Sequence, residues 1–394
     1  MFRPAFSETI AGMSGNVIRE ILKLTQQPEV ISFAGGMPPA DAFPLDSLRE
    51  ISDMAFDKYR ESILQYGTSE GFLPLREFIV GWMAEKGIKA GLDEVMIISG
   101  SQQGIDLAAK AFLSPGDGVV VENPTYLAAI QIFKLYGARF LFGESDENGF
   151  MPYSLREAVH NSECKLLYLV PSFQNPTGIT LAEERRKELA AMLEEAGLVL
   201  IEDDPYGDLC FNGEDIMPVK AFDHKNRIVY LGSFSKIISP GLRVGFAVGP
   251  KEIIGKMIVG KQASDVHTSN LAQAIIFEFC SRGLLKPHIE SLRKQYRKKR
   301  DLMLDLMAAH FPSAVSWTRP EGGLFIWVRL PEGISAGELF KEAIKDKVAF
   351  IPGDSFFAAG GGTNTFRLNF SNASTAQIEE GIARLGKTLS RFLN

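Results

Sequence analysis

The sequence contains little cysteine and no long hydrophobic run. Its three cysteines are Cys164, Cys210 and Cys280, and no two of them have C-x-x-C spacing. An odd, widely spaced set argues against a disulfide framework and a zinc site, so we expect a reducing, cytoplasmic environment. No stretch approaches the ~18 apolar residues of a membrane span. Residues 1–15, which include Glu8, lack the apolar segment of a signal peptide.

An excess of positive charge is also missing. Lys and Arg total 42 against 48 Asp and Glu, which leaves a net charge of -6. An acidic chain is unsuited to general binding of nucleic-acid phosphates. One basic group stands apart, and we interpret it as the solvated face of a long helix. Its members are Arg293, Lys294, Arg297, Lys298, Lys299 and Arg300.

Several common catalytic motifs are absent. G-x-G-x-x-G, H-E-x-x-H and G-x-S-x-G do not occur, so dinucleotide-binding, zinc-peptidase and α/β-hydrolase readings lack support. A G-x-x-x-x-G-K-T match at 381–388 follows a capping box and has apolar residues at helical spacing, which predicts a terminal amphipathic helix rather than a phosphate loop. ESDENG at 144–149 lacks the glutamate that a calcium loop needs where Leu155 stands, and we interpret it as a turn. No metal site is predicted.

Short apolar runs alternate with helical stretches between residues 95 and 250. The runs show no apolar–polar alternation, so both faces of each strand should be buried. Such strand–helix repetition predicts an α/β fold with a mostly parallel sheet covered by helices. The predicted strands are 95–100, 118–122, 138–143, 165–170, 198–203, 227–232 and 244–249.

The pattern changes at both ends of the chain. A long helical stretch after residue 286 leads into strands around Gly322-Gly323 and then mixed helix and strand, which predicts a small α+β unit. The first 45 residues include a Gly- and Pro-rich extended segment. We expect an N-terminal segment (1–45) that is part of the small domain, a large domain (46–286) and a C-terminal small domain (287–394).

The most informative segment runs from Gly232 to Arg243, after one apolar strand and before another. Ser233, Ser235 and Arg243 can donate hydrogen bonds to a phosphate or another oxyanion. Lys236 stands between them at the end of a buried strand, where desolvation would favour its neutral, nucleophilic form. A lone lysine is usually a surface residue, but these flanking residues favour a site.

Other strand ends carry groups that fit the same ligand. Ser101 and Gln102 begin a helix after a strand, which suits an anion, although a well-capped helix would look the same. Tyr126 offers an aromatic face, and Asn175 lies in a rigid polar turn. Asp203 and Tyr206 could hold a pyridinium nitrogen and a phenolic oxygen. Open α/β sheets bind ligands at the carboxyl ends of their strands.

Taken together, these segments resemble the fold-type I, pyridoxal 5'-phosphate (PLP)-dependent aminotransferases of class I/II over essentially the whole chain. The motifs that carry the resemblance are S-x-S-K-x(6)-R at 233–243, N-P-T-G at 175–178 and D-x-x-Y at 203–206. SFAGGMP, GSQQ and PSFQNPTG make the chain look most like the 2-aminoadipate and multi-substrate subfamily. The resemblance implies a large PLP-binding domain with a seven-stranded type of sheet, plus a small α+β domain.

The resemblance also implies roles for individual residues. Lys236 would bind PLP as a Schiff base and then act as general base and acid. Arg367 would bind the substrate α-carboxylate, assisted by Gly36 and Asn175. Tyr66 would reach the phosphate of the partner subunit, which implies a homodimer. Arg19 matches a position that reads a distal carboxylate, but it could equally lie on the polar face of a helix. The remaining cofactor contacts would be Asp203 to the ring nitrogen, Tyr206 and Asn175 to the ring 3'-oxygen, Tyr126 stacked on the ring, and Ser101, Gln102, Ser233, Ser235 and Arg243 to the phosphate.

The implied reaction moves an amino group between an L-amino acid and a 2-oxo acid such as 2-oxoglutarate. The donors we expect are glutamate, 2-aminoadipate, aromatic or branched-chain amino acids. Two alternatives stay open: a PLP-dependent lyase acting at Cβ or Cγ on the same fold, and a non-enzymatic, aminotransferase-like sensor domain.

Overall fold

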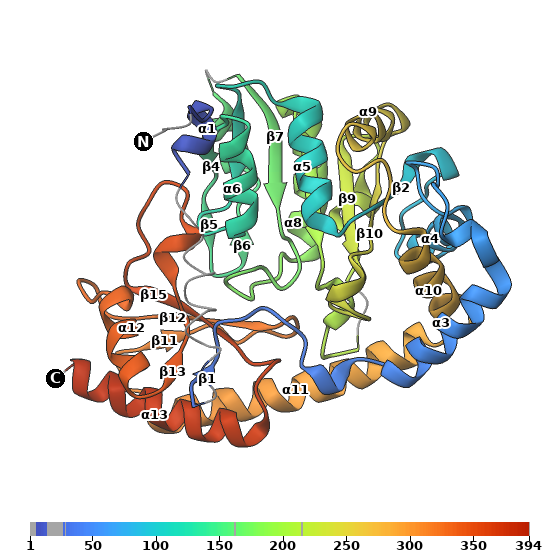
Figure 1. Ribbon diagram of the computed structural model, residues 1–394. Coiled ribbons are helices and arrows are strands. Elements are labelled where there is room, and N and C mark those ends of the chain that lie inside the picture. Colours follow the sequence, from blue (N-terminus) through green and yellow to red (C-terminus); the bar gives the residue numbers. More distant parts are fainter. Residues whose placement is uncertain (1–4, 14–26, 28, 161–162, 214–215, 394) are drawn as a thin grey trace.

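The structure, a computed structural model, describes residues 5–13, 27, 29–160, 163–213 and 216–393. Its centre is a seven-stranded sheet in the order β2-β10-β9-β8-β7-β3-β4 (Figure 1). β10 runs antiparallel to both of its neighbours, and the other neighbouring pairs are parallel. The predicted α/β fold with a mostly parallel sheet is therefore confirmed. The strands are β2 (Val95–Ile98), β3 (Gly118–Val121), β4 (Arg139–Phe142), β7 (Cys164–Leu169), β8 (Val199–Asp204), β9 (Ile228–Ser233) and β10 (Gly245–Val248).

Helices cover both faces of this sheet, which explains why its strands are apolar throughout. Val119 and Val121 of β3 belong to the core on one face, and Val120 between them belongs to a second core on the other. Helices α5 (Ser101–Phe112), α6 (Leu127–Leu135) and α9 (Lys251–Gln262) contribute to the first core. Helices α7 (Ser154–Val159) and α8 (Glu183–Ala196) contribute to the second. Figure 1 shows α5 and α6 in front of the strands.

A second group of helices lies beyond the β2 edge of the sheet (Figure 1). It comprises α3 (Leu45–Tyr59), α4 (Leu73–Glu85) and α10 (Asn270–Ser281), and α10 packs against both of the others. At the opposite edge lies the short helix α1 (Glu8–Ala11), which contacts α6. No helix in the described part of the chain is both long and apolar enough to cross a membrane.

The C-terminal part forms an antiparallel sheet in the order β11-β12-β15-β14. Its strands are β11 (Ser316–Trp317), β12 (Phe325–Arg329), β14 (Ile351–Pro352) and β15 (Thr365–Asn369), accompanied by α11 (Leu285–His310), α12 (Ala336–Lys345) and α13 (Thr375–Leu393). Near the other end of the chain, β1 (Ile31–Ser32) pairs in parallel with β13 (Val348–Ala349). This pairing joins the N-terminal segment to the C-terminal sheet region.

The expectation that the basic group on α11 is a solvated face is wrong in part. Lys299 is only 9% exposed, and its Nζ donates to the Ser371 carbonyl at 2.7 Å. Arg293 Nε donates to the Asp208 carbonyl at 2.7 Å, and Arg300 donates to the Pro320 carbonyl. The long helix runs beneath other elements (Figure 1), so Arg293, Lys299 and Arg300 donate to backbone carbonyl groups of those elements. Lys294, Arg297 and Lys298 are exposed, as predicted.

Both segments that imitate ligand-binding motifs have structural roles. Residues 381–388 lie inside α13, as predicted, and the two glycines permit close packing. A Cβ on Gly381 would lie 2.6 Å from the Phe33 ring, and one on Gly386 would lie 2.6 Å from the His310 carbonyl. The 144–149 segment forms the turn between β5 (Ser145–Asp146) and β6 (Gly149–Phe150), again as predicted.

Candidate active site

A cavity of about 250 Å³ lies at the carboxyl ends of the central strands. Twelve residues singled out from the sequence line it: Gly36, Ser101, Gln102, Tyr126, Asn175, Asp203, Tyr206, Ser233, Ser235, Lys236, Arg243 and Arg367. A neighbouring cavity of about 470 Å³ shares Val170 but contains none of these twelve. The chemistry therefore belongs to the smaller cavity.

The topology of the sheet brings these residues together. Ser233 ends β9, and Asp203 and Asp204 end the adjacent parallel strand β8, with Asp203 opposite Leu231. Tyr126 immediately precedes α6, and Ser101 is the first residue of α5. Because parallel strands end at the same edge, turns far apart in the sequence converge at one place.

Lys236 lines the cavity. Its Nζ donates to the Gly36 carbonyl at 2.7 Å, which brings the N-terminal segment to the site. The side chain borders the cavity yet is closely surrounded by protein, and this burial lowers its pKa to about 8. The positive charges of Arg367 and Arg243 act in the same direction, while Asp203 opposes them. A substantial fraction of the amine is therefore neutral near neutral pH.

Asp203 is 2% exposed, and only one of its two carboxylate oxygens has a hydrogen-bond partner among the described residues. Its Oδ2 accepts a hydrogen bond from the Tyr168 hydroxyl at 2.8 Å, whereas Oδ1 has no hydrogen-bond partner among the described residues. Burial raises the pKa of this carboxyl to about 7, against a smaller opposing effect of Tyr168. An unpaired buried carboxylate oxygen is costly, so the site fits a ligand with a cationic N–H at this position.

Arg367 reaches the cavity from β15 of the smaller sheet and is 3% exposed. Nη1 donates to Asn175 Oδ1 and Nη2 to the Ala34 carbonyl, both at 2.7 Å. Its guanidinium carbon lies 4.2 Å from the centre of the Phe325 ring. Nε is buried without a partner in the described part of the chain. A fixed guanidinium with a free donor suits a carboxylate.

An anion cradle forms around the first turn of α5. Arg243 Nη2 donates to the Ser99 carbonyl at 2.9 Å, and Nη1 lies 3.5 Å from Ser235 Oγ. Gly100 has φ +83°, and a Cβ there would lie 2.5 Å from Arg243 Nη2, so only glycine fits. Arg243 itself is exposed, at the mouth of the cavity. Helix-terminal N–H groups and a guanidinium together suit a phosphate.

The two tyrosines of the cavity both remain protonated. Burial raises the pKa of Tyr126 to about 12 and raises that of Tyr206 still further. Tyr206 also meets the Phe325 ring edge-on, with the ring centres 5.8 Å apart. Both phenols can therefore donate a hydrogen bond to an anionic ligand oxygen.

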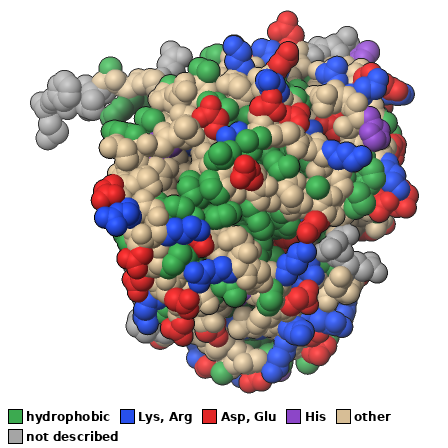
Figure 2. All heavy atoms as spheres, turned by 90° about the vertical axis from the view of Figure 1, so that its right-hand side faces the viewer, with side chains coloured by type: hydrophobic (Ala, Val, Ile, Leu, Met, Phe, Trp, Pro, Cys, Tyr) green, Lys and Arg blue, Asp and Glu red, His purple; other side chains and the backbone are tan. Residues whose placement is uncertain are grey.

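Among the described residues, one predicted site residue, Tyr66, does not line the cavity. Tyr66 lies on the surface, 81% exposed, with its ring edge-on to His267. Phe56, Leu64 and Leu73, which are near it in the sequence, are also exposed. Figure 2 shows apolar side chains gathered on the face of the molecule that lies on the right-hand side of Figure 1. Arg19 lies outside the described residues.

Sequence reasoning missed the apolar part of the lining. Phe325 supports both Arg367 and Tyr206, and Val170 and Pro205 follow strand ends. An aromatic residue inside GGLF carries no chemical signal of its own. The signal in the sequence is positional, because Val170 ends the predicted strand 165–170 and Pro205 lies two residues beyond the predicted strand 198–203.

Comparisons with known proteins identify the family of the chain. The family model described as aminotransferase class I and II matches residues 29–385. An aromatic-amino-acid aminotransferase of Thermococcus litoralis is 41% identical over 98% of this chain and 94% of its own length. A 2-aminoadipate transaminase of Thermus thermophilus is 42% identical over 99% of this chain and 97% of its own. The crystal structure of a kynurenine aminotransferase of Pyrococcus horikoshii, in complex with PMP, superposes with a TM-score of 0.95 at 42% identity, covering 99% of this chain and 98% of that one.

Proposed function

The chain belongs to the class I and II aminotransferase family, and we propose that it transfers the amino group of glutamate, 2-aminoadipate, aromatic or branched-chain amino acids to a 2-oxo acid such as 2-oxoglutarate. The protein is an amino-acid transaminase with PLP as its cofactor. One observation supports the proposed roles most directly. A lysine of lowered pKa, an unpaired aspartate oxygen and an arginine with a free Nε converge on one cavity.

The residues present fit PLP. We assign its ring nitrogen to Asp203, whose unpaired Oδ1 requires a cationic N–H, and its 3'-oxygen to Tyr206 and Asn175. Tyr126 would stack on the ring. The phosphate contacts would come from Ser101, Gln102, Ser233, Ser235 and Arg243, which surround the first turn of α5. When bound, PLP supplies an electrophilic carbon and an electron-accepting ring.

Lys236 would carry out the proton transfers. With a pKa of about 8 its Nζ is partly neutral at working pH, so it can remove the substrate Cα proton and later return a proton. The contact of Nζ with the Gly36 carbonyl keeps the amine in the cavity. Asp203, held by Tyr168, would keep its negative charge against the ring nitrogen throughout.

Arg367 would orient the substrate. Asn175 and Ala34 fix the guanidinium plane, and the free Nε together with the outer N–H groups can receive the α-carboxylate. Gly36 would leave room for this group. Arg19 remains our proposed reader of a distal carboxylate, which would favour acidic donors and acceptors.

We further propose a homodimer in which Tyr66 completes the phosphate site of the partner subunit. The 81% exposure of Tyr66, together with the exposure of the apolar residues Leu64 and Leu73 near it in the sequence, supports a second copy of the chain as the occupant. We also assign residues 1–45 and 287–394 to one small domain, supported by the β1–β13 pairing, and 46–286 to the large domain. Three free thiols support a cytoplasmic location.

The decisive experiment is a panel of amino donors with 2-oxoglutarate, scored for glutamate. Wild type should form glutamate, Lys236→Ala should not, and the control Lys256→Ala, at an exposed position on α9, should behave as wild type. Ammonia or pyruvate without glutamate would instead indicate the lyase. Binding of PLP with no turnover of any donor would indicate the sensor domain.

Mixed dimers test the role of Tyr66. Tyr66→Ala and Lys236→Ala subunits are each expected to form inactive homodimers. If Tyr66 acts across the interface, a mixed dimer has one intact site, and random 1:1 mixing restores about a quarter of wild-type activity. If Tyr66 acts within its own chain, mixing restores none.

A further inference from the structure

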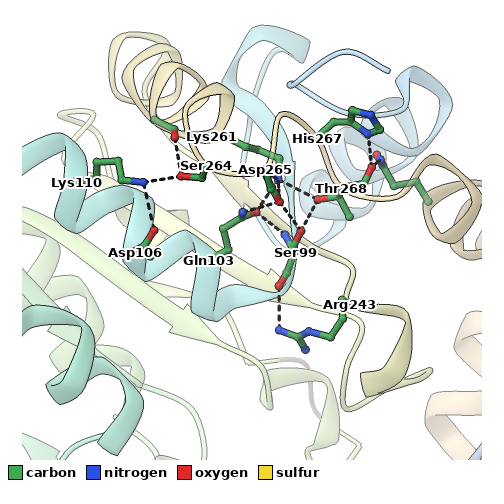
Figure 3. Close-up of polar contacts among 12 residues, drawn as sticks. Ser99, Gln103, Asp106, Lys110, Arg243, Lys261, Ser264, Asp265, His267 and Thr268 are labelled. Atoms are coloured by element: carbon green, nitrogen blue, oxygen red, sulfur yellow. Dashed lines mark hydrogen bonds and ion pairs between the residues drawn. The ribbon is translucent and has the colours of Figure 1, made fainter. Parts of the chain in front are cut away.

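A buried lysine lies behind the anion cradle without touching the cavity. Lys261, near the end of α9, has no exposed surface. Its Nζ donates to Gln103 Oε1 at 2.6 Å, to Asp265 Oδ1 at 2.9 Å and to Thr268 Oγ1 at 3.1 Å (Figure 3). We call these four residues the Lys261 cluster. None of them lines the candidate active site.

The Lys261 cluster accepts hydrogen bonds from both donors of Ser99, its backbone N–H and its hydroxyl. The Ser99 backbone N–H donates to Gln103 Oε1 at 2.7 Å. The Ser99 hydroxyl donates to Asp265 Oδ2 at 3.0 Å and lies 3.0 Å from Thr268 Oγ1. Gln103 Nε2 also donates to Asp265 Oδ2 at 2.8 Å, which locks the acceptors of the cluster in one arrangement. The Lys261 cluster therefore fixes Ser99 in place through groups that do not line the cavity (Figure 3).

Ser99 in turn determines where Arg243 lies. Its carbonyl accepts the hydrogen bond from Arg243 Nη2 at 2.9 Å. Because Arg243 is exposed, little packing restrains its long side chain, and the other hydrogen bond, to Ser235, is long at 3.5 Å. The Ser99 carbonyl is thus the main anchor of the guanidinium. Displacement of that carbonyl would free the Arg243 side chain, and a guanidinium binds a phosphate well only in the right orientation.

Stability alone gives a weak account of the cluster. Burial lowers the pKa of Lys261, although Asp265 opposes this effect, so taking the ammonium out of water has a cost. Well-packed apolar residues often replace a buried ion pair with no loss of stability. A charged side chain that makes three directed contacts does what an apolar one cannot, since it fixes the positions of the groups around it.

We propose that Lys261 is a positioning residue for the cofactor phosphate: through Gln103 and Asp265 it holds Ser99, and Ser99 aims Arg243 at the phosphate. This inference rests on the proposed assignment of the phosphate to Arg243. It deepens that assignment by adding a residue that contacts neither cofactor nor substrate.

The test compares two ligands of the apoenzyme, PLP and pyridoxal, which differ by the phosphate. Binding is followed by quenching of tryptophan fluorescence, without any turnover. Lys261→Met should raise the Kd for PLP about tenfold, the effect of one misplaced charge-assisted hydrogen bond, and should leave the Kd for pyridoxal within about twofold. An equal loss for both ligands, or no loss for either, would overturn the proposal.

Lys110→Met is the matched control. Lys110 joins the same two regions, donating to Ser264 Oγ at 2.5 Å and lying 3.7 Å from Asp106, but it does not contact Ser99 (Figure 3). It should leave both Kd values unchanged. If Lys261→Met does not fold, Ser99→Ala removes only the hydroxyl contacts and should still weaken PLP selectively. An unchanged preference of Ser99→Ala for PLP would then overturn the proposal.

Arg243→Gln distinguishes a failure of the positioning role of Lys261 from a failure of the phosphate assignment to Arg243. It should abolish most of the preference for PLP over pyridoxal. If it does so while Lys261→Met changes nothing, only the positioning role is wrong. If Arg243→Gln keeps the full preference, the phosphate assignment itself is wrong.

Discussion

The lowered pKa of Lys236 predicts how the apoenzyme captures PLP as pH changes. Only the neutral amine can attack the aldehyde carbon of PLP. With a pKa of about 8 instead of the ordinary 10.5, about one amine in ten is neutral at pH 7 rather than about one in 3,000. The neutral, reactive fraction at pH 7 is therefore about 300-fold larger than for an ordinary lysine, and capture should be correspondingly faster. Its rate should rise tenfold per pH unit below the pKa and level off above about pH 8.

The assay mixes apoenzyme with PLP in a stopped-flow instrument from pH 6 to 10 and follows the absorbance of the bound cofactor. Borohydride reduction and peptide mapping should place the label on Lys236, and Lys236→Met should show no capture. A small primary amine in the same buffers corrects for the titration of PLP itself. A rate that keeps rising tenfold per pH unit beyond pH 9 would refute the lowered pKa.

The charges near Lys236 predict in which direction the midpoint of this pH dependence moves when they are removed. Arg243→Gln removes a positive charge that lowers the pKa of Lys236, so the midpoint should move to higher pH. Asp203→Asn removes the opposing negative charge, so the midpoint should move to lower pH. Between pH 8 and 10.5 the unfolded chain binds more protons at this lysine than the folded one. Apoprotein stability should therefore rise with pH across that window in wild type relative to Lys236→Met, as read from Tm. Shifts of both midpoints in one direction would refute the electrostatic account.

Three further substitutions have defined outcomes. Asp203→Asn should lower kcat/KM by at least about a hundredfold, because it removes the buried charge that we assign to the ring nitrogen. Circular dichroism should show an unchanged fold, and activity within a few-fold of wild type would contradict the assignment. Arg367→Lys should raise the KM of the amino donor about tenfold or more with a smaller effect on kcat, because an ammonium cannot form the two-point contact; steady-state kinetics would disprove this if kcat alone fell. Arg19→Ala should impair glutamate and 2-aminoadipate more than phenylalanine, and equal losses in the donor panel would exclude a role in specificity.

The sequence predicts many of the cavity-lining residues because these residues lie at or just after the ends of strands. Short apolar runs identify the strands, and parallel topology makes their carboxyl ends meet. The sequence therefore predicts that Asp203, Asn175 and Lys236 lie together, and all three line one cavity. Arg367 is predicted only by the resemblance to a family, since nothing in the local pattern of TFRLNFS shows that a side chain of β15 lines the cavity at the central strands.

The apolar partners were beyond prediction for a physical reason. Phe325 becomes a functional neighbour only because β12 lies beside β15 and faces the end of β8. For Lys299 the sequence predicts exposure, and this prediction is wrong. A basic run on a helix is usually solvated, yet tertiary packing buries this lysine against the Ser371 carbonyl. Periodicity indicates which face of a helix is polar, but it does not indicate whether another element covers that face.

Lys261 illustrates this limit most sharply. Lys261 and Asp265 are four residues apart, a spacing that typically forms a solvated helical ion pair worth a few tenths of a kcal/mol. Asp106 and Lys110 have the same spacing on α5, and their side chains are 34% and 35% exposed. Two features distinguish the pairs. Asp265 lies beyond the end of α9, whereas Asp106 and Lys110 both lie within α5. The packing of α5 against α9 also leaves Lys261 wholly buried, with its Nζ against Gln103 Oε1. The same local pattern is therefore a surface pair in one place and, by our proposal, a support for the phosphate site in the other.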